Sequence, residues 1–236
     1  DWSSCLLAKK ILVDTRQHVD YFAKTFYISI GKMIAVPIGA DEDIFYPRPD
    51  SLPHSRMIIH FHGTFIPLQG VRTIVAAAVL AKEQPWIFRI VGNGQDFAKI
   101  QEIVREQELV NVELVGKVSL DEVPGYIAAA DLCLGIFGAT NKTLRVVPNK
   151  VYECIAMRKP VLTANTPAMK EHFSNEKNIF LCATDDPQSL YTVMHRVMTD
   201  PGLIEKVARS GQELFRKRFS APALVVQLLT CLDYQL

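Results

Sequence analysis

The sequence predicts an α/β protein built on a doubly wound, parallel sheet of six strands and followed by two C-terminal helices. Between residues 57 and 200, short apolar runs typical of buried strands alternate with segments that have the apolar spacing of helices. Strands that alternate with helices pair in parallel through right-handed crossovers. After residue 200 the alternation ends, and two consecutive helical patterns follow at 203–219 and 222–234.

Each element has its own signal in the chain. The predicted strands are 57–61, 87–91, 112–115, 132–135, 160–163 and 179–182. Apolar residues repeat at helical spacing over 71–79 and 190–198, and more loosely over 97–104. Three further helix starts are marked by a capping side chain before a proline, at Thr166-Pro167, Asp186-Pro187 and Asp200-Pro201.

The first fifty residues do not form a domain by themselves. They contain a predicted strand at 11–13, a helix at 16–26 and a strand at 33–37, which are too few elements to bury their own apolar faces. We therefore expect residues 1–38 to be the remnant of a larger N-terminal domain and 39–54, with prolines and acids, to be an interdomain linker. Residues 55–219 form the main domain, and 220–236 a C-terminal helix.

The composition excludes several classes of function. Twenty-six Lys and Arg against 25 Asp and Glu give a net charge of +1, which argues against a nucleic-acid partner. No run of about eighteen uncharged apolar residues exists, so we expect no transmembrane segment. Four of the five cysteines lie in apolar stretches and are interpreted as reduced core residues of a cytoplasmic protein. His60 and His62 share one strand face without a third ligand at metal spacing, so no metal site is predicted.

Loops at the carboxyl ends of the strands are where an open parallel sheet binds its ligand. After the first strand, the loop 62–70 has a glycine near each end and leads into a helix whose free N–H groups suit an anion. The loops 92–94 and 116–118 follow the next two strands, and each also fits an ordinary glycine turn. The candidate ligand contacts in these loops are Gly63, Thr64, Gln69, Gly92, Gly94 and Lys117.

The loop after the fourth strand carries the strongest signal. No acidic residue occurs between Asp131 and Glu153, whereas Lys142, Arg145 and Lys150 supply three cations. Asn149 is the expected N-cap of the next helix, which puts Lys150 in the first turn. A cation there opposes the helix dipole by roughly 0.3–1 kcal/mol unless an anion is bound. Phosphate binding, with Gly138 in the same loop, is therefore predicted over a solvated basic loop. Glu153 is placed either to accept from a ribose diol or to favour the dipole.

Several of these residues fit one family pattern. The order Gly63…Gln69-Gly70, Gly92-x-Gly94, Gly116-x-Val118 and Asn149-Lys150-Val151-Tyr152-Glu153, continuing to Lys159-Pro160-Val161, resembles the C-terminal, donor-binding domain of GT-B glycosyltransferases. The sequence is most similar to family 4 of the retaining enzymes (group 1), from about residue 30 to 220. Residues 34–47 resemble the segment that joins the two GT-B domains.

The resemblance implies a sugar transferase of the hexosyltransferase type. The donor is a nucleoside-diphosphate sugar, the acceptor binds to the missing N-terminal domain, and no cofactor or obligatory metal is required. Arg145, Lys150 and Glu153 would be the catalytic residues. The piece alone would be inactive, and the family allows peripheral contact with the inner face of a membrane.

The chain departs from the family pattern at its phosphate clamp. The usual Arg and Lys of the first loop are replaced by Thr64 and Gln69, and the first of two family glutamates falls on Arg145. Arg158 replaces a helix-ending glycine. We expect Lys142, Arg145 and Lys150 to supply the charge from the opposite side of the crevice. Two alternatives stay open, a GT-B nucleotide-sugar 2-epimerase and a non-catalytic nucleotide-binding domain.

Overall fold

The computed structural model describes residues 2–49 and 55–232, which contain the predicted α/β fold. All six predicted strands are present, each within one residue of its expected ends, and they form one parallel sheet of order β5-β4-β3-β6-β7-β8. The strands are β3 (Met57–His62), β4 (Trp86–Val91), β5 (Val112–Gly116), β6 (Leu132–Leu134), β7 (Val161–Ala164) and β8 (Phe180–Cys182).

The strand order reverses at the centre of this sheet. Counted from β3 along the chain, the order is the 3-2-1-4-5-6 arrangement of doubly wound folds. The reversal lies between β3 and β6, which pair only through Ile59–Leu132 and His60–Cys133. Because the connections leave these two strands in opposite directions, a crevice opens beyond their carboxyl ends.

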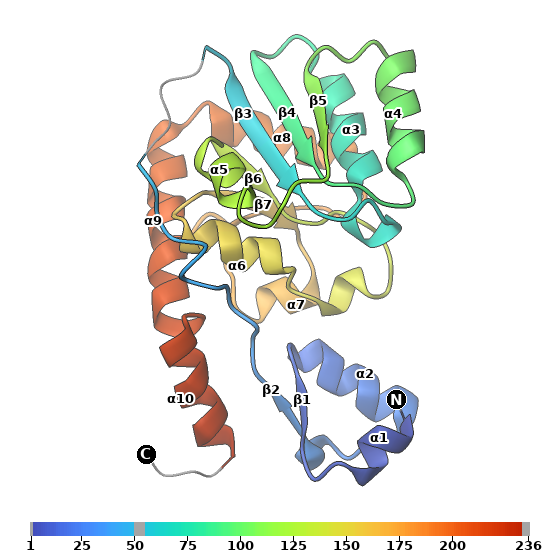
Figure 1. Cartoon of the computed structure of the whole chain (residues 1–236), viewed down its shortest axis with the longest axis vertical. Coiled ribbons are helices and arrows are strands. Elements are labelled where there is room, and N and C mark those ends of the chain that lie inside the picture. Colours follow the sequence, from blue (N-terminus) through green and yellow to red (C-terminus); the bar gives the residue numbers. More distant parts are fainter. Residues whose placement is uncertain (1, 50–54, 233–236) are drawn as a thin grey trace.

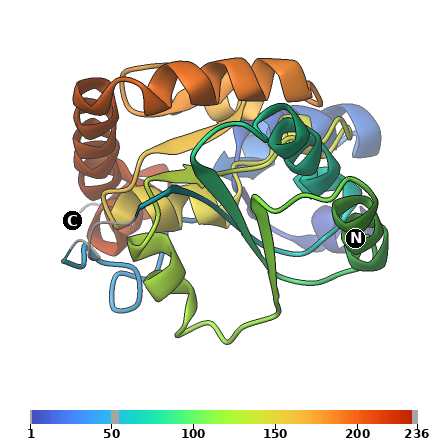
Figure 2. The ribbon, with the colours of Figure 1, turned by 90° about the horizontal axis from the view of Figure 1, so that it is seen from above.

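Helices cover both faces of the sheet (Figures 1 and 2). The helices α3 (Val71–Leu80), α4 (Phe97–Glu106) and α8 (Pro187–Met198) bury one core cluster with one face. The helices α5 (Val123–Ala128), α6 (Asn149–Ala156) and α7 (Pro167–Lys170) bury a second cluster. The long helix α9 (Pro201–Arg218) contributes to both clusters, and α10 (Ala221–Cys231) follows it.

The predicted helix starts are confirmed by hydrogen bonds. Thr166, Asp186 and Asp200 each accept a hydrogen bond from a backbone N–H three residues later. Arg158 takes the left-handed conformation, φ 58°, at the end of α6, as the replacement of the family glycine predicts. The prediction for Asn149 is wrong by one residue: Pro148 is the N-cap, and no side chain caps the start of α6.

The N-terminal part has the predicted elements and one more. Strand β1 (Ile11–Val13) pairs in parallel with β2 (Met33–Ala35), and α2 (Arg16–Phe26) packs on them. Helix α1 (Trp2–Leu7) had no sequence signal, since Cys5 is its single buried residue. Figure 1 shows this part opposite α6 and α7.

The domain boundaries themselves stay predictions. The linker prediction includes residues 50–54, and the C-terminal helix prediction includes 233–236, which lie outside the described residues. The described part of the linker is packed against the α9–α10 junction: Glu42 accepts a 2.8 Å hydrogen bond from the Ala221 N–H. The four cysteines predicted in the core are buried and unpaired. In the described part of the chain, no helix has both the length and the apolar character needed to cross a membrane.

Candidate functional site

A cleft of about 680 Å³ opens beyond the carboxyl ends of β3 and β6, at the point of strand reversal. The loop after β3, the loop before α6, the first turns of α6 and a few N-terminal residues line it. The lining residues are Asp14, His18, Ile38, His62, Gly63, Thr64, Ile66, Leu68, Gln69, Lys142, Val146, Val147, Pro148, Asn149, Lys150 and Glu153. This size is typical of small-molecule sites.

Lys150 lies at the floor of the cleft and is 5% exposed. Its ammonium donates a hydrogen bond to Gln69 Oε1 and lies 3.7 Å from the centroid of the Phe61 ring. Gly63 beside it has φ +151°, a backbone conformation that favours glycine, and a Cβ at that position would be 2.7 Å from Lys150 Nζ. Burial lowers the pKa of Lys150 to about 7, although the Glu153 carboxylate opposes this shift. A desolvated ammonium with neutral contacts is a strong site for an anion.

Glu153 follows one turn later on α6 and is held by a histidine. Its Oε2 is 2.8 Å from Nε2 of His62, whose Nδ1 is 2.9 Å from Nε2 of His60. Both rings are on the sheet face that α5 and α6 cover, as expected for residues two apart in a strand. Burial lowers the pKa of both histidines, that of His60 well below its usual value, so both are neutral at pH 7.

The structure brings most of the predicted ligand contacts together. Those that line the main cleft are Gly63, Thr64, Gln69, Lys142, Asn149, Lys150 and Glu153. The remaining loop candidates line an adjoining hollow of about 580 Å³ that shares His62, Gly63 and Thr64; they are Gly92, Gly94 and Lys117. Short segments that follow the strands β3, β4 and β5 thus meet at this hollow.

Three of the predicted glycines have a packing reason for their identity. A Cβ at Gly92 would be 1.9 Å from the Gly63 carbonyl oxygen, and one at Gly94 would be 2.7 Å from the Phe65 backbone. Gly138 lies in a separate hollow, and its Cβ would be 2.2 Å from the Pro67 carbonyl oxygen. These positions therefore let neighbouring loops approach one another.

Arg145 does not join the cleft. It ends a 3₁₀ turn, Thr143–Arg145, and its guanidinium lies 3.8 Å from the centroid of the Tyr21 ring in α2. Its carbonyl oxygen accepts a 2.6 Å hydrogen bond from Thr15 Oγ1. Of the three predicted cations, Lys150 and the exposed Lys142 therefore line the cleft, whereas Arg145 packs against the N-terminal part.

Sequence reasoning missed three titratable residues of the cleft wall. For His62 the sequence argues against a metal site and indicates no other role, although its spacing from His60 shows that both side chains face one way. Asp14 and His18 are hydrogen-bonded through Nδ1 of His18, and they line the cleft from the N-terminal part. They had no local signal, because the cleft brings them to residues more than forty positions away.

Among residues 2–49 and 55–232, no cluster of three or more His, Cys, Asp or Glu side chains is arranged to hold a metal ion. Nitrogen atoms of His60 and His62 are instead engaged with one another.

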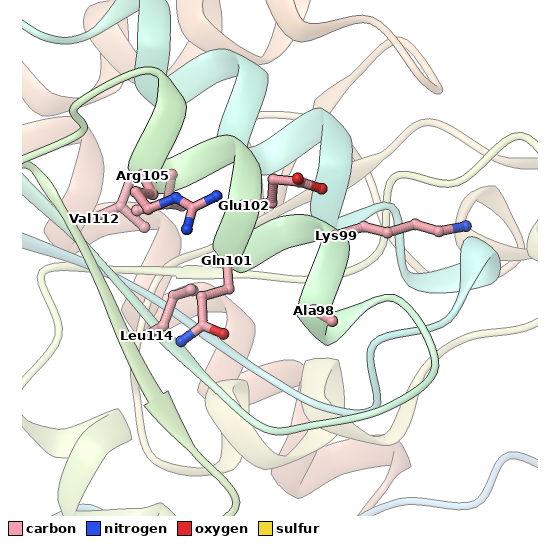
Figure 3. A pocket seen from close by; sticks show the side chains of 8 residues that line it. Ala98, Lys99, Gln101, Glu102, Arg105, Val112 and Leu114 are labelled. Atoms are coloured by element: carbon pink, nitrogen blue, oxygen red, sulfur yellow. The ribbon is translucent and has the colours of Figure 1, made fainter.

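A second hollow, of about 750 Å³, lies between α4 and the edge strand β5 (Figure 3). Gln101 lies over Leu114 and Arg105 over Val112, whereas Lys99 points away. The hollow is beside the sheet and not beyond the strand ends, and no predicted site residue lines it. It therefore lacks the position and the convergent polar groups of the cleft at the strand reversal.

The fold and the cleft define a Rossmann-like domain with a lysine-lined cleft at its strand reversal. The sequence profile of the family described as "Glycosyl transferases group 1" matches residues 56–200. Because this match covers more than half of the chain, the chain belongs to the group 1 glycosyltransferases, which have the GT-B architecture.

Individual relatives agree with this assignment. An uncharacterized glycosyltransferase of Methanocaldococcus jannaschii is 25% identical over 167 residues, which is 68% of this chain and 43% of that protein. HepE of Anabaena, solved in complex with UDP and glucose, has a TM-score of 0.81 at 15% identity and covers 98% of this chain. Sucrose-phosphate synthase of Thermosynechococcus elongatus has a TM-score of 0.79 at 21% identity over 96% of this chain.

This chain spans only part of each of these proteins. It covers 43% of the archaeal relative, 65% of the HepE chain and 59% of the sucrose-phosphate synthase chain. The structural likeness, at these identities, describes the fold.

Proposed function

We propose that residues 55–219 bind the nucleoside diphosphate of a sugar-nucleotide donor, and that the protein to which they belong transfers the sugar, a hexose, to an acceptor. The observation that carries this proposal is the buried ammonium of Lys150 beside the uncapped start of α6, at the strand reversal. A diphosphate would receive hydrogen bonds from the free N–H groups of the helix start and from the ammonium together. The UDP-bound relatives are consistent with such a ligand.

Lys150 replaces the missing phosphate clamp in this proposal. The family places cations at the positions of Thr64 and Gln69, and the Lys150 ammonium is hydrogen-bonded to Gln69 and lies next to Gly63. The charge therefore reaches the same loop from the other side of the cleft. Lys142 is exposed and lines the cleft. Its flexible side chain adds a second cation that can reach the ligand.

The Lys150 ammonium and the N–H groups at the start of α6 would also lower the barrier of the transfer reaction. When the bond between the anomeric carbon and the diphosphate oxygen breaks, negative charge builds up on the leaving diphosphate. A preorganised ammonium and helix N–H groups stabilise the transition state, in which this charge develops, more than they stabilise the ground state. This difference lowers the barrier. No metal ion is part of this proposal. Glu153, one turn further on, is placed to accept a hydrogen bond from the ribose.

The acceptor is proposed to bind to a domain to which residues 1–38 contribute. Large apolar side chains of this part are exposed, among them Trp2, Leu6, Leu12 and Ile30, as expected where a further domain packs. Turnover is therefore proposed for the whole protein, and donor binding alone for the described piece.

A non-catalytic nucleotide-binding domain is the second candidate. It is favoured by Arg145, which occupies the position of the first family glutamate and packs on Tyr21, so the cleft has no carboxylate from that position. Hydrolysis or transfer of a donor sugar by the whole protein would exclude this candidate.

The proposed function is tested by nucleotide binding. UDP, GDP and ADP at a concentration one hundredfold above Kd would each stabilise the native state by about 2.7 kcal/mol. We expect at least one of them to raise Tm of the wild type, and Lys150→Met to abolish the rise. Lys99→Met, which removes an exposed cation beside the hollow of Figure 3, is the control. Unchanged Tm with all three nucleotides at millimolar concentration would refute the proposal.

A further inference from the structure

Glu153, His62 and His60 form a row of hydrogen bonds that runs from the cleft into the protein. The two distances are 2.8 Å from Glu153 Oε2 to His62 Nε2 and 2.9 Å from His62 Nδ1 to His60 Nε2. His60 is fully buried, and its ring is stacked on Tyr126 with an angle of 11° between the planes. The ring planes of the row are therefore fixed by packing as well as by hydrogen bonds.

Proton counting assigns the tautomers of this row. The carboxylate can only accept, so His62 carries its proton on Nε2 and its Nδ1 is an acceptor. Nε2 of His60 must then be the donor to His62, which leaves Nδ1 of His60 as a bare acceptor. That atom is indeed buried without a hydrogen-bond partner. The opposite direction would require a protonated Glu153 and would bury a donor N–H of His60 without an acceptor.

The row also explains an ion pair that does not form. Lys150 and Glu153 are three residues apart on α6, a spacing at which opposite charges commonly pair. Glu153 instead accepts a hydrogen bond from the neutral His62, and the ammonium of Lys150 donates to Gln69. His62 thus holds the carboxylate away from the ammonium.

We propose that His62, backed by His60, is a positioning residue that holds Glu153 so that one carboxylate oxygen accepts from a ribose hydroxyl while Lys150 stays available for the diphosphate. This inference rests on the proposed function. Oε2 of Glu153 is occupied by His62, and Oε1 is the oxygen left for a ligand in the cleft. Without His62, the carboxylate is free to rotate towards Lys150, and both ligand contacts weaken together.

The test compares ribose with deoxyribose in matched variants. Calorimetry with UDP, GDP and ADP identifies the nucleotide that binds, and its 2′-deoxy and 3′-deoxy forms are then titrated. We expect one deoxy form to bind the wild type about tenfold more weakly or worse, as for a hydrogen bond to a charged group. The ratio of the Kd of this deoxy form to the Kd of the parent nucleotide should fall to about two in His62→Phe. In His62→Gln, which retains a donor in place of Nε2, most of the tenfold ratio should remain.

His172→Phe is the matched control. It also replaces an imidazole whose two nitrogens are buried without a hydrogen-bond partner, and whose half-buried ring packs on Phe219, away from the cleft. A deoxy ratio that is the same in wild type and His62→Phe would overturn the inference, although the proposed function would stand. Failure of all three nucleotides to bind the wild type would refute the proposed function itself.

A second measurement needs no ligand. Long-range proton–nitrogen NMR spectra distinguish the two neutral tautomers of histidine and the imidazolium. We expect His60 and His62 to be neutral and protonated on Nε2 at pH 7. Protonation of His62 on Nδ1, or a charged His62, would overturn the assigned row and with it the positioning role.

Discussion

Replacing Lys150 by Met is expected to stabilise the ligand-free protein, even though it removes the cation on which the proposed nucleotide binding depends. The lowering of the Lys150 pKa from 10.5 to about 7 corresponds to about 5 kcal/mol of unfavourable ammonium burial. Met has a similar length and no charge. Because the hydrogen bond to Gln69 and the Phe61 contact are lost with the ammonium, we expect a net gain of about 1–4 kcal/mol at pH 6.

The pH dependence of this difference identifies its cause. Between the folded pKa near 7 and the unfolded value of 10.5, the unfolded chain holds one more proton on Lys150 than the folded chain. The free energy of unfolding of the wild type therefore rises with pH in this range, by up to about 1.4 kcal/mol per unit. Relative to Lys150→Met, it should rise by about 2 kcal/mol from pH 7 to pH 9.

Urea denaturation of both proteins at pH 6, 7, 8 and 9, without nucleotide, measures this difference directly. The contributions of groups other than Lys150 to the pH dependence of the unfolding free energy cancel in the comparison. Lys99→Met controls for the loss of an exposed lysine. A wild-type-to-variant difference that stays constant from pH 6 to pH 9 would show that the Lys150 ammonium is not desolvated. The conclusion that burial at the cleft floor lowers the pKa of Lys150 would then be wrong.

Three further outcomes follow from the same structure. Nucleotide affinity measured by calorimetry should fall as pH rises above 7, by up to about tenfold per unit, because the ligand needs the protonated form of Lys150. An affinity that stays constant from pH 6 to 9 would contradict this expectation. Gly70→Ala should cost about 2 kcal/mol or more in urea denaturation, since φ is +69° and a Cβ would be 2.5 Å from a backbone nitrogen. Gly125→Ala, in open space within α5, should be neutral or stabilising by about 0.5–1 kcal/mol. Arg145→Ala should destabilise by about 1 kcal/mol through its contact with Tyr21 and lower nucleotide affinity much less than Lys150→Met does; an equal loss of affinity would place Arg145 at the ligand after all.

Local patterns predicted the fold because each element carries its own signal. Apolar runs located the six strands, and the three Asp- or Thr-Pro pairs located helix starts that the side chains cap. Lys150 could also be placed, since a helix start at a strand-end loop has a known position in a doubly wound sheet.

Contacts between distant residues could not be predicted in this way. Arg145 is also a cationic residue type and lies five residues before Lys150, but its direction is decided by the Tyr21 ring, 124 positions earlier in the chain. His62 had no visible partner in the sequence, because Glu153 is 91 residues further on. The number of cations in a loop therefore indicates that some of them line a cleft, but does not show which of them do.

The cleft at the strand reversal and the N-terminal part depend on one another. Glu171, directly after α7, accepts hydrogen bonds of 2.9 and 3.0 Å from the backbone N–H groups of Arg16 and Gln17, and so caps the start of α2 across the junction. That cap fixes the turn from which Asp14 and His18 reach the cleft wall. Since the two walls of the cleft come from the two parts of the chain, a change in how α2 docks on α7 would also change the shape of the site around Lys150 and its ligand.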